Sequence, residues 1–249
     1  MQKKFPRIST RGYFDLYTGK TVKKNAYFLY PKKFFENFKS KDLTIMIHGM
    51  RNDNAGAVTK FEIAKKRLHT LGYKHPVVGF SYDANTRGAH LKRHEKRALK
   101  TGQLIAKKNG TNLSQFIIDF KESNPSVRIR MMGHSLGSNV IQSTVMNLAK
   151  KYAKDIISSI YLFGASIPSN SFLYSMYGRF YQKVVEQKII NYYSPGDEVL
   201  QQGVDEKLIS APIGLVGARG KTISKYSQKK VTPENHRFIS YSKVLKRFP

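Results

Sequence analysis

Short apolar runs alternate with segments of helical periodicity along most of this chain. Most of the runs carry no charged side chain, which suits strands that are covered on both faces of a sheet. The runs are Leu43–Ile47, Val77–Phe80, Val127–Met132, Ile157–Phe163 and Ile189–Tyr193. Segments 55–71, 99–123, 138–152 and 171–186 lie between them and have the spacing of helices. Strands that alternate with helices form parallel βαβ units. The order predicts an α/β fold with a mostly parallel, doubly wound sheet and helices on both faces.

Three further stretches have weaker patterns. Within residues 1–42, Tyr13–Tyr17 and Ala26–Tyr30 alternate enough to form two short N-terminal strands. Leu208–Val216 is a candidate for a last strand, and Asn109-Gly110 is expected to divide the segment 99–123 into two helices. No internal repeat or linker of low complexity interrupts the sequence, so we expect one domain over residues 1–249.

The chain is strongly basic, with 44 Lys and Arg residues against 16 Asp and Glu and a formal net charge of +28. Such a surface attracts nucleic acid, acidic lipid headgroups or acidic substrates. Hydrophobic residues make up 40% of the sequence, which supports a packed core and excludes a wholly disordered chain. Cysteine is absent, which excludes disulfides, thiolate metal sites and a cysteine nucleophile.

No apolar stretch approaches the roughly 20 residues of a membrane-spanning helix, and no signal-peptide pattern follows the N-terminus. We therefore expect a cytoplasmic protein, either free in solution or peripheral to an anionic surface. Basic residues concentrate between Arg87 and Lys108, where Glu95 is the one acid. This segment, 84–112, either flanks the active site as a basic wall or is a solvated helix face in a chain that is basic everywhere.

The sharpest local signal is Gly133-His134-Ser135-Leu136-Gly137, a G-x-S-x-G pentapeptide between an apolar strand and a helix. A serine on such a tight strand-to-helix turn has its hydroxyl exposed above the sheet, and the glycines leave room for the turn. The alternative is a plain structural turn. The position between strand and helix favours Ser135 as a nucleophile.

A serine hydroxyl needs a base to take its proton, and seven histidines are available. His48 and His134 lie next to glycines inside motifs, where they point away from this role. His236 lies in a loop after the last predicted strand, from which it can reach across the C-terminal edge of the sheet. We therefore assign His236 as the base, against the alternative that it is a surface or packing residue.

The base in turn needs a carboxylate to hold its ring. Asp197 follows the strand Ile189–Tyr193 in a Pro-Gly turn, at the edge of the sheet where ligands bind in such folds. Asp83 also follows a strand but precedes the nucleophile, and Glu198 is adjacent to Asp197. The chain order Ser135, Asp197, His236 favours Asp197.

Charge that develops on a substrate oxygen needs hydrogen-bond donors. The backbone N–H of Leu136, directly after the nucleophile, is the first expected donor. The loop after Leu43–Ile47 carries His48-Gly49-Met50, and we assign the second donor to the N–H of Met50. The alternative for His48-Gly49 is a simple turn at the end of a strand.

With these motifs the chain resembles the α/β-hydrolase superfamily, and within it serine esterases and lipases. The resemblance rests on the His48-Gly49 loop, the Gly133–Gly137 elbow and the Pro195-Gly196-Asp197 turn, and it spans about residues 42–240. It implies Ser135 as nucleophile, Asp197 as acid and His236 as base, with Met50 and Leu136 as oxyanion donors and no cofactor. It also implies an α/β-hydrolase fold.

The expected function is hydrolysis of carboxylic esters, small or lipid, through an acyl-enzyme intermediate. Two other classes stay open. An acyltransferase would use the same three residues with an alcohol or amine in place of water. A non-catalytic module would use its charge to bind an anionic membrane or nucleic acid. No His and carboxylate spacing indicates a metal site, and the sequence leaves the oligomeric state open.

Overall fold

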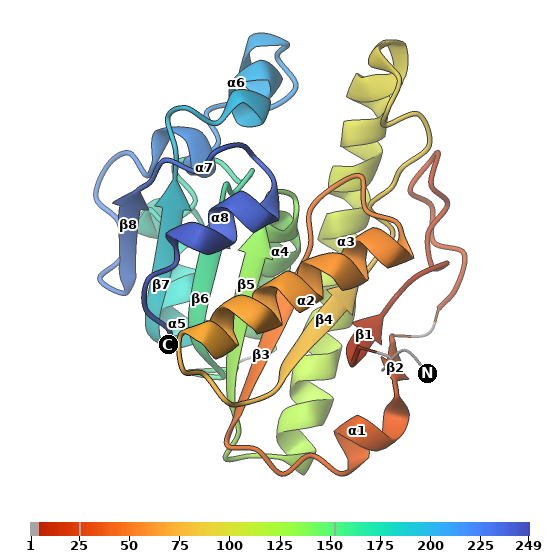
Figure 1. Cartoon of the computed structure of the whole chain (residues 1–249), viewed down its shortest axis with the longest axis vertical. Helices are drawn as coiled ribbons and strands as arrows, with labels where there is room; N and C mark the ends of the chain where they lie inside the picture. The colour runs from red at the N-terminus through yellow and green to blue at the C-terminus, as the bar shows by residue number, and fades with distance from the viewer. Residues whose placement is uncertain (1–4, 25, 152) are drawn as a thin grey trace.

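A computed structural model describes residues 5–24, 26–151 and 153–249 (Figure 1) and contains one eight-stranded sheet. The strands stand in the order β2-β1-β4-β3-β5-β6-β7-β8. Only β2 runs antiparallel to its neighbour. Their bounds are β1 Arg7–Ser9, β2 Phe28–Tyr30, β3 Asp42–Ile47, β4 Val77–Ser81, β5 Arg128–His134, β6 Ile157–Phe163, β7 Val185–Tyr193 and β8 Tyr226–Lys230. The predicted parallel sheet is confirmed.

Helices cover both faces of the sheet, as Figure 1 shows. On one face lie α2 (Asn54–Thr70) and α8 (Phe238–Val244), whose apolar side chains pack on Met46 of β3 and Tyr161 of β6. On the other lie α3 (Glu95–Ser123), α4 (Gly137–Lys150) and α5 (Arg179–Val184), packed on the alternate strand residues such as Ile45 and Ile160. Because successive strand residues face opposite sides, each inner strand supplies both cores. The predicted α/β architecture, a doubly wound sheet with helices on both faces, is thereby confirmed.

Smaller elements complete the chain outside these layers. They are α1 (Lys32–Glu36), the 3₁₀ turn η1 (Lys92–His94), the π-helical turn η2 (Tyr174–Gly178), α6 (Glu198–Asp205) and α7 (Ile213–Val216). Figure 1 shows α6 and the first turns of α3 rising beyond the C-terminal ends of the strands. These two helices therefore flank the edge of the sheet where the motifs lie.

The N-terminal strands differ from the prediction. The stretch Tyr13–Tyr17 is not a strand, because the Asp15 side chain accepts hydrogen bonds from the Thr18 N–H at 2.7 Å and the Thr18 hydroxyl at 2.7 Å. Such local bonds close a turn in place of a ladder. The paired strands are instead β1 and β2, the second of which covers the last three residues of the predicted Ala26–Tyr30.

The predicted break at Asn109-Gly110 is wrong, since α3 is continuous. A Cβ on Gly110 would overlap the side chain of Ser143 on α4, so the glycine lets two helices approach closely. The amide of Asn109 donates to the Ile105 carbonyl at 2.9 Å, and its oxygen accepts from Thr10 at 2.6 Å. Asn and Gly are typical of helix ends in a sequence, but here both residues serve the packing of α3.

The predicted strand Leu208–Val216 is also wrong. Its second half forms α7, and the last strand is β8, which lies at the sheet edge with mostly exposed polar side chains. An edge strand of this kind has no apolar periodicity to reveal it. The predicted helix 171–186 is in fact η2 followed by α5, and β7 begins four residues before the predicted strand at Ile189.

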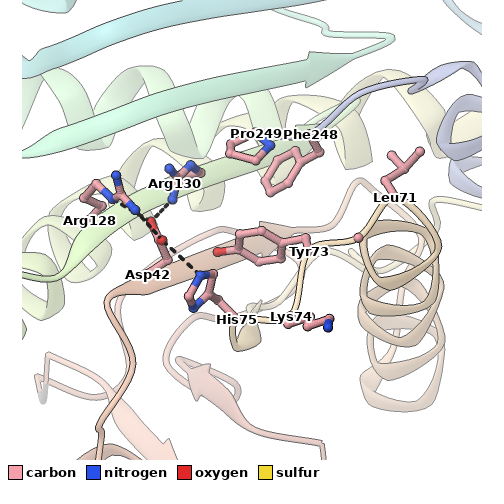
Figure 2. A pocket seen from close by; sticks show the side chains of 10 residues that line it. Asp42, Leu71, Tyr73, Lys74, His75, Arg128, Arg130, Phe248 and Pro249 are labelled. Atoms are coloured by element: carbon pink, nitrogen blue, oxygen red, sulfur yellow. Dashed lines mark hydrogen bonds and ion pairs between the residues drawn. The ribbon is translucent and has the colours of Figure 1, made fainter.

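At the N-terminal edge of the sheet, Asp42 is held by cations (Figure 2). Arg128 donates to it through Nε at 3.0 Å and Nη2 at 2.8 Å, Arg130 donates through Nη1, and Nε2 of His75 lies at 3.4 Å. Burial would raise the pKa of Asp42, but the two arginines outweigh it, so this pKa lies below its ordinary value. The cluster borders a cavity of about 470 Å³ and ties the start of β3 to the start of β5.

Candidate active site

Ser135 stands on the turn between β5 and α4 with a φ of +51°. Few residues other than glycine adopt this left-handed conformation. The adjacent backbone leaves no room for side chains. A Cβ on Gly137 would lie 2.5 Å from the Ile47 carbonyl oxygen, and one on Gly133 would lie 2.6 Å from Ile141 Cδ1. The elbow therefore has the geometry that the pentapeptide predicted.

His236 lies in the loop between β8 and α8, beside Ser135. Its Nε2 is 2.9 Å from the Ser135 Oγ, and its Nδ1 is 2.7 Å and 2.9 Å from the two carboxylate oxygens of Asp197. If Nδ1–H donates to the carboxylate, Nε2 is left to accept the serine hydroxyl proton. The structure thus joins the three predicted residues, from three distant segments, in one hydrogen-bonded row.

Asp197 is fully buried and serves two structural purposes. One carboxylate oxygen accepts from the Leu200 N–H at 3.0 Å, which caps α6, and the other accepts from the Tyr241 hydroxyl at 2.6 Å. Burial alone would raise the pKa of Asp197, but His236, then Tyr241 and Leu200, outweigh burial and lower it. This carboxyl is therefore ionised at neutral pH. Asp83, the other candidate, lies elsewhere and accepts from the Gly12 N–H at 2.9 Å.

His134 holds the loop that carries His236. Its Nε2 is 2.8 Å from the His236 carbonyl oxygen, to which it can donate. Burial, and then the proximity of His236, lowers the pKa of His134 to about 3, so the ring is neutral at physiological pH. In this geometry His134 is a support for the loop rather than a base.

The loop at residues 48–52, which we call the oxyanion loop, passes directly over Ser135. A Cβ on Gly49 would lie 2.9 Å from the Ser135 Cβ, so only glycine fits this approach. The Asn52 amide donates to the carbonyls of Gly49 at 3.0 Å and Met50 at 2.8 Å, and the Arg51 N–H donates to Ala84 at 2.8 Å. The loop is therefore held both by its own hydrogen bonds and by a bond to the segment after β4.

His48 anchors the start of the oxyanion loop. It is buried, stacks on Tyr82 with ring centroids 4.5 Å apart, and its Nδ1 lies 2.9 Å from the Gly49 carbonyl oxygen. The Arg11 side chain reaches it from the N-terminal segment and also donates to the carbonyls of Asn52 at 3.1 Å and Asp53 at 2.9 Å. Burial, then Arg11, lowers the pKa of His48 to about 3, so it stays neutral.

A cavity of about 940 Å³ opens above these groups. Met50, Ser135, Leu136 and His236 all line it, and Asp197 lies behind His236, to which it is hydrogen-bonded. Side chains from α2, α3, α6 and the loops beside them form the outer walls of the cavity. They include the apolar side chains Leu99, Val199, Leu200, Leu208 and Ile209, and the charged side chains Arg51, Lys60, Glu95, Glu198, Glu206 and Arg237. The predicted basic segment thus contributes Glu95 and Leu99 to one wall.

Three residues of the site lie outside the sequence analysis: Arg11, Asn52 and Tyr241. Asn52 could have been found, because an asparagine two residues beyond the expected donor is a turn-forming residue. Arg11 and Tyr241 act across 37 and 44 positions of the chain, on His48 and Asp197, and no local pattern links them.

Within residues 5–24, 26–151 and 153–249, no group of three His, Asp or Glu side chains could hold a metal ion. None of the helices in this described part is long and apolar enough to span a bilayer.

Several solved structures resemble this one at low sequence identity. A lipase-esterase related protein from Clostridium acetobutylicum is 8% identical, with a TM-score of 0.44 over 84% of this chain and 93% of that chain. MenH from S. aureus is 9% identical, with a TM-score of 0.43 over 84% and 92%. The Trichoderma reesei cutinase is 17% identical, with a TM-score of 0.37 over 72% and 73%.

A comparison with curated proteins gives no match. Residues 98–230 match the family described as "Protein of unknown function (DUF726)". The matched segment includes the elbow with Ser135 and the turn with Asp197, and it covers more than half of the sequence. The chain therefore belongs to the DUF726 family.

Proposed function

We propose that this protein is a serine hydrolase that cleaves carboxylic esters through an acyl-enzyme intermediate. The observation that carries the proposal is the hydrogen-bonded row from the Ser135 hydroxyl through His236 to Asp197. A nucleophile, a base and a group that orients the base are the arrangement that activates a serine. The left-handed φ of Ser135 adds support, because strained backbone of this kind gathers at functional sites.

Acylation begins when the Ser135 Oγ attacks the ester carbonyl carbon while its proton passes to Nε2 of His236. The carbonyl π electrons move to oxygen and give a tetrahedral oxyanion. This intermediate collapses as the C–O bond to the alcohol breaks, and His236 returns the proton to the departing oxygen. In deacylation, His236 takes a proton from water, whose oxygen attacks the acyl carbon, and then protonates Ser135 as the acid leaves. Asp197 stabilises the imidazolium at each stage.

The backbone N–H groups of Met50 and Leu136 are the proposed donors to the oxyanion. Both residues line the cavity beside Ser135, one from the oxyanion loop and one from the first residue after the nucleophile. The bonds made by Asn52 and Arg51 hold the loop before substrate arrives, so little reorganisation is needed during the reaction. A preorganised donor of this kind is worth about 3 kcal/mol of barrier.

The cavity supports an ester with an apolar acyl group. Leucine, valine and isoleucine side chains from α3, α6 and the segment after α6 line the cavity. A volume of about 940 Å³ exceeds that of a short acyl chain, so lipid-sized esters are within its range.

Labelling with a fluorophosphonate probe tests the proposal without assuming a substrate. We expect Ser135 to be labelled, Ser135→Ala to show no labelling, and His236→Ala to lose about 10²–10⁴-fold in labelling rate. His69→Ala is the matched control, because His69 is exposed on the outer face of α2 and should label like the parent.

A folded parent that remains unlabelled would contradict the proposal. A labelled parent whose acyl-enzyme yields product only with an added alcohol or amine would identify an acyltransferase. Product analysis with a series of p-nitrophenyl esters separates these outcomes.

A further inference from the structure

Exposed apolar side chains and basic side chains lie together on one side of the molecule. The surface, which we call the basic apolar face, combines the loop 14–24, the loop before α3 and the first half of α3. Its apolar members include Leu16, Tyr17, Leu91 and Leu104, which are 37%, 48%, 50% and 41% exposed. Its exposed basic members include Lys20, Arg87, Lys92, Arg93, Lys96, Lys100 and Lys107.

Direct contacts hold this face together. The Arg97 guanidinium lies 3.7 Å from the centroid of the Tyr17 ring, and the Thr101 hydroxyl donates to the Tyr17 carbonyl at 3.0 Å. The Leu104 side chain packs against Gly19, where a Cβ would lie 2.9 Å from it. The loop and the helix therefore present one continuous surface.

The positive charge of the face is largely uncompensated. Glu95 is ion-paired with Arg51, and Asp15 accepts the hydrogen bonds of its own turn. No ion pair between described residues involves Lys92, Arg93, Lys96 or Lys100. A surface with this excess of positive charge attracts a partner that carries net negative charge.

The face also borders the mouth of the active-site cavity. Glu95 and Leu99 line the cavity from the same helix turns that carry Lys92, Lys96 and Lys100 on the outside. Figure 1 shows these first turns of α3 extending past the edge of the sheet, across from α6. Whatever binds the face therefore lies next to the entrance to Ser135.

We propose that the basic apolar face docks on an anionic lipid bilayer. Leucine side chains insert into the boundary between headgroups and acyl chains, tyrosine lies at the headgroup level, and lysine and arginine contact acidic headgroups. Two features favour a bilayer over nucleic acid. Leu91 and Leu104 are aliphatic and offer no ring on which bases stack, and neither belongs to the buried core that would explain an apolar residue there.

Docking in this orientation brings the cavity mouth to the lipid surface. A lipid ester could then enter without crossing bulk water. The docking itself does not depend on the proposed chemistry, so it can be measured with the hydroxyl of Ser135 removed.

Co-sedimentation with vesicles of phosphatidylcholine, with and without phosphatidylglycerol, tests the proposal. The full chain carrying Ser135→Ala is used, so that no vesicle lipid is cleaved. We expect binding only when phosphatidylglycerol is present. The double variant Lys96→Glu and Lys100→Glu should weaken it at least about tenfold, since each basic residue near the surface contributes to binding.

The matched control is Lys150→Glu with Lys154→Glu. These exposed lysines lie where α4 ends and before β6 begins, at the opposite edge of the sheet, and should bind vesicles like the parent. The variant Leu91→Ser with Leu104→Ser keeps the charge and should also lose most binding. Circular dichroism melts of every variant, with Leu91→Ser alone as a milder change, confirm that losses are not unfolding.

The proposal is overturned if both lysine pairs have the same effect, because the binding is then due to overall charge. It also fails if the leucine variant binds vesicles like the parent, or if duplex DNA binds the same face more tightly than the vesicles do. Failure of the fluorophosphonate test would leave the docking result unaffected, so the two proposals can be judged separately.

Discussion

Tyr241 contributes one hydrogen bond to the site, which one substitution can remove. Its hydroxyl donates to the Asp197 carboxylate at 2.6 Å from a buried position on α8. This bond helps to lower the pKa of Asp197 and fixes the plane of the carboxylate that faces His236. A hydrogen bond to a charged group is worth about 1.5–3 kcal/mol.

We expect Tyr241→Phe to lower kcat/KM for an ester, or the rate of fluorophosphonate labelling, by about tenfold or more. The pKa of Asp197 should rise, because its carboxylate loses a donor that favours the charged form, and the pH–rate profile should change with it. Tyr181→Phe is the control, because Tyr181 is equally buried and its hydroxyl has no hydrogen-bond partner among the described residues. Equal rates and equal pH profiles for Tyr241→Phe and the parent would show that the hydroxyl has only a packing role.

At the residue scale, Ser135 and Asp197 could be proposed as site residues because their sequence signals are local. Ser135 is marked by its own neighbours, and Asp197 by a Pro-Gly turn after a strand. His236 has no such motif, and only its place after the other two residues indicated it. The roles of Tyr241 and Arg11 could not be predicted, because each contacts a residue that is far away in the sequence and near only in the folded protein.

At the scale of elements, the contact between α3 and α4 depends on Gly110. A Cβ there would overlap the Cβ and Oγ of Ser143 and approach the backbone of α4, so the side chain alone could not relieve the clash. Overpacking of this kind costs about 1–3 kcal/mol, which exceeds the gain of about 1 kcal/mol from replacing a helical glycine by alanine.

We therefore expect Gly110→Ala to lower the free energy of unfolding by up to about 2 kcal/mol, measured by urea denaturation. Gly102→Ala, in the same helix, is the matched control. Its Cβ would meet the nearest atoms at 3.4 Å and beyond, so the protein should be as stable as the parent or more so. If both variants behave alike, the close approach of the two helices is not what requires glycine at position 110.

The elements that the sequence missed have two physical causes. β8 was missed because an exposed edge strand has no apolar periodicity. The helix α3 was predicted as two helices because the sequence does not distinguish a glycine that allows close packing from one that ends a helix. The inner strands were found because burial on both faces imposes a continuous apolar run. Hydrophobic patterns in a sequence indicate which residues are buried. They do not reveal an exposed strand, and they do not show where two helices pack closely.

At the scale of the whole molecule, carboxyl groups with low pKa values make folding dependent on pH. The folded-state pKa of Asp42 lies below its ordinary value of about 3.9. The stabilisation is therefore fully present above that ordinary value and is lost as the pH falls through the folded-state pKa. Asp197 acts in the same direction.

We expect Asp42→Asn to lower the free energy of unfolding by about 3–5 kcal/mol at pH 7, because it leaves the buried Arg130 without its carboxylate. The difference from the parent should begin to shrink below about pH 4, where the carboxyl is protonated in the unfolded chain, and should be lost as the pH falls through the lower folded-state pKa. Urea denaturation between pH 7 and pH 3 measures both quantities. A difference that stays constant over this range would show that the charge of Asp42 does not stabilise the fold.

The backbone of Ser135 has a consequence for the other members of the DUF726 family. Asp197 also caps α6, so a relative could keep an aspartate here for the sake of that helix after losing any chemistry. Serine at a φ of +51° offers the fold no comparable benefit, since glycine adopts that conformation more easily. In a relative that has no catalytic activity, we therefore expect the serine to be replaced before the aspartate. For the proposed hydrolase chemistry, the residue at position 135, rather than the full set of three, is therefore the one to compare among relatives.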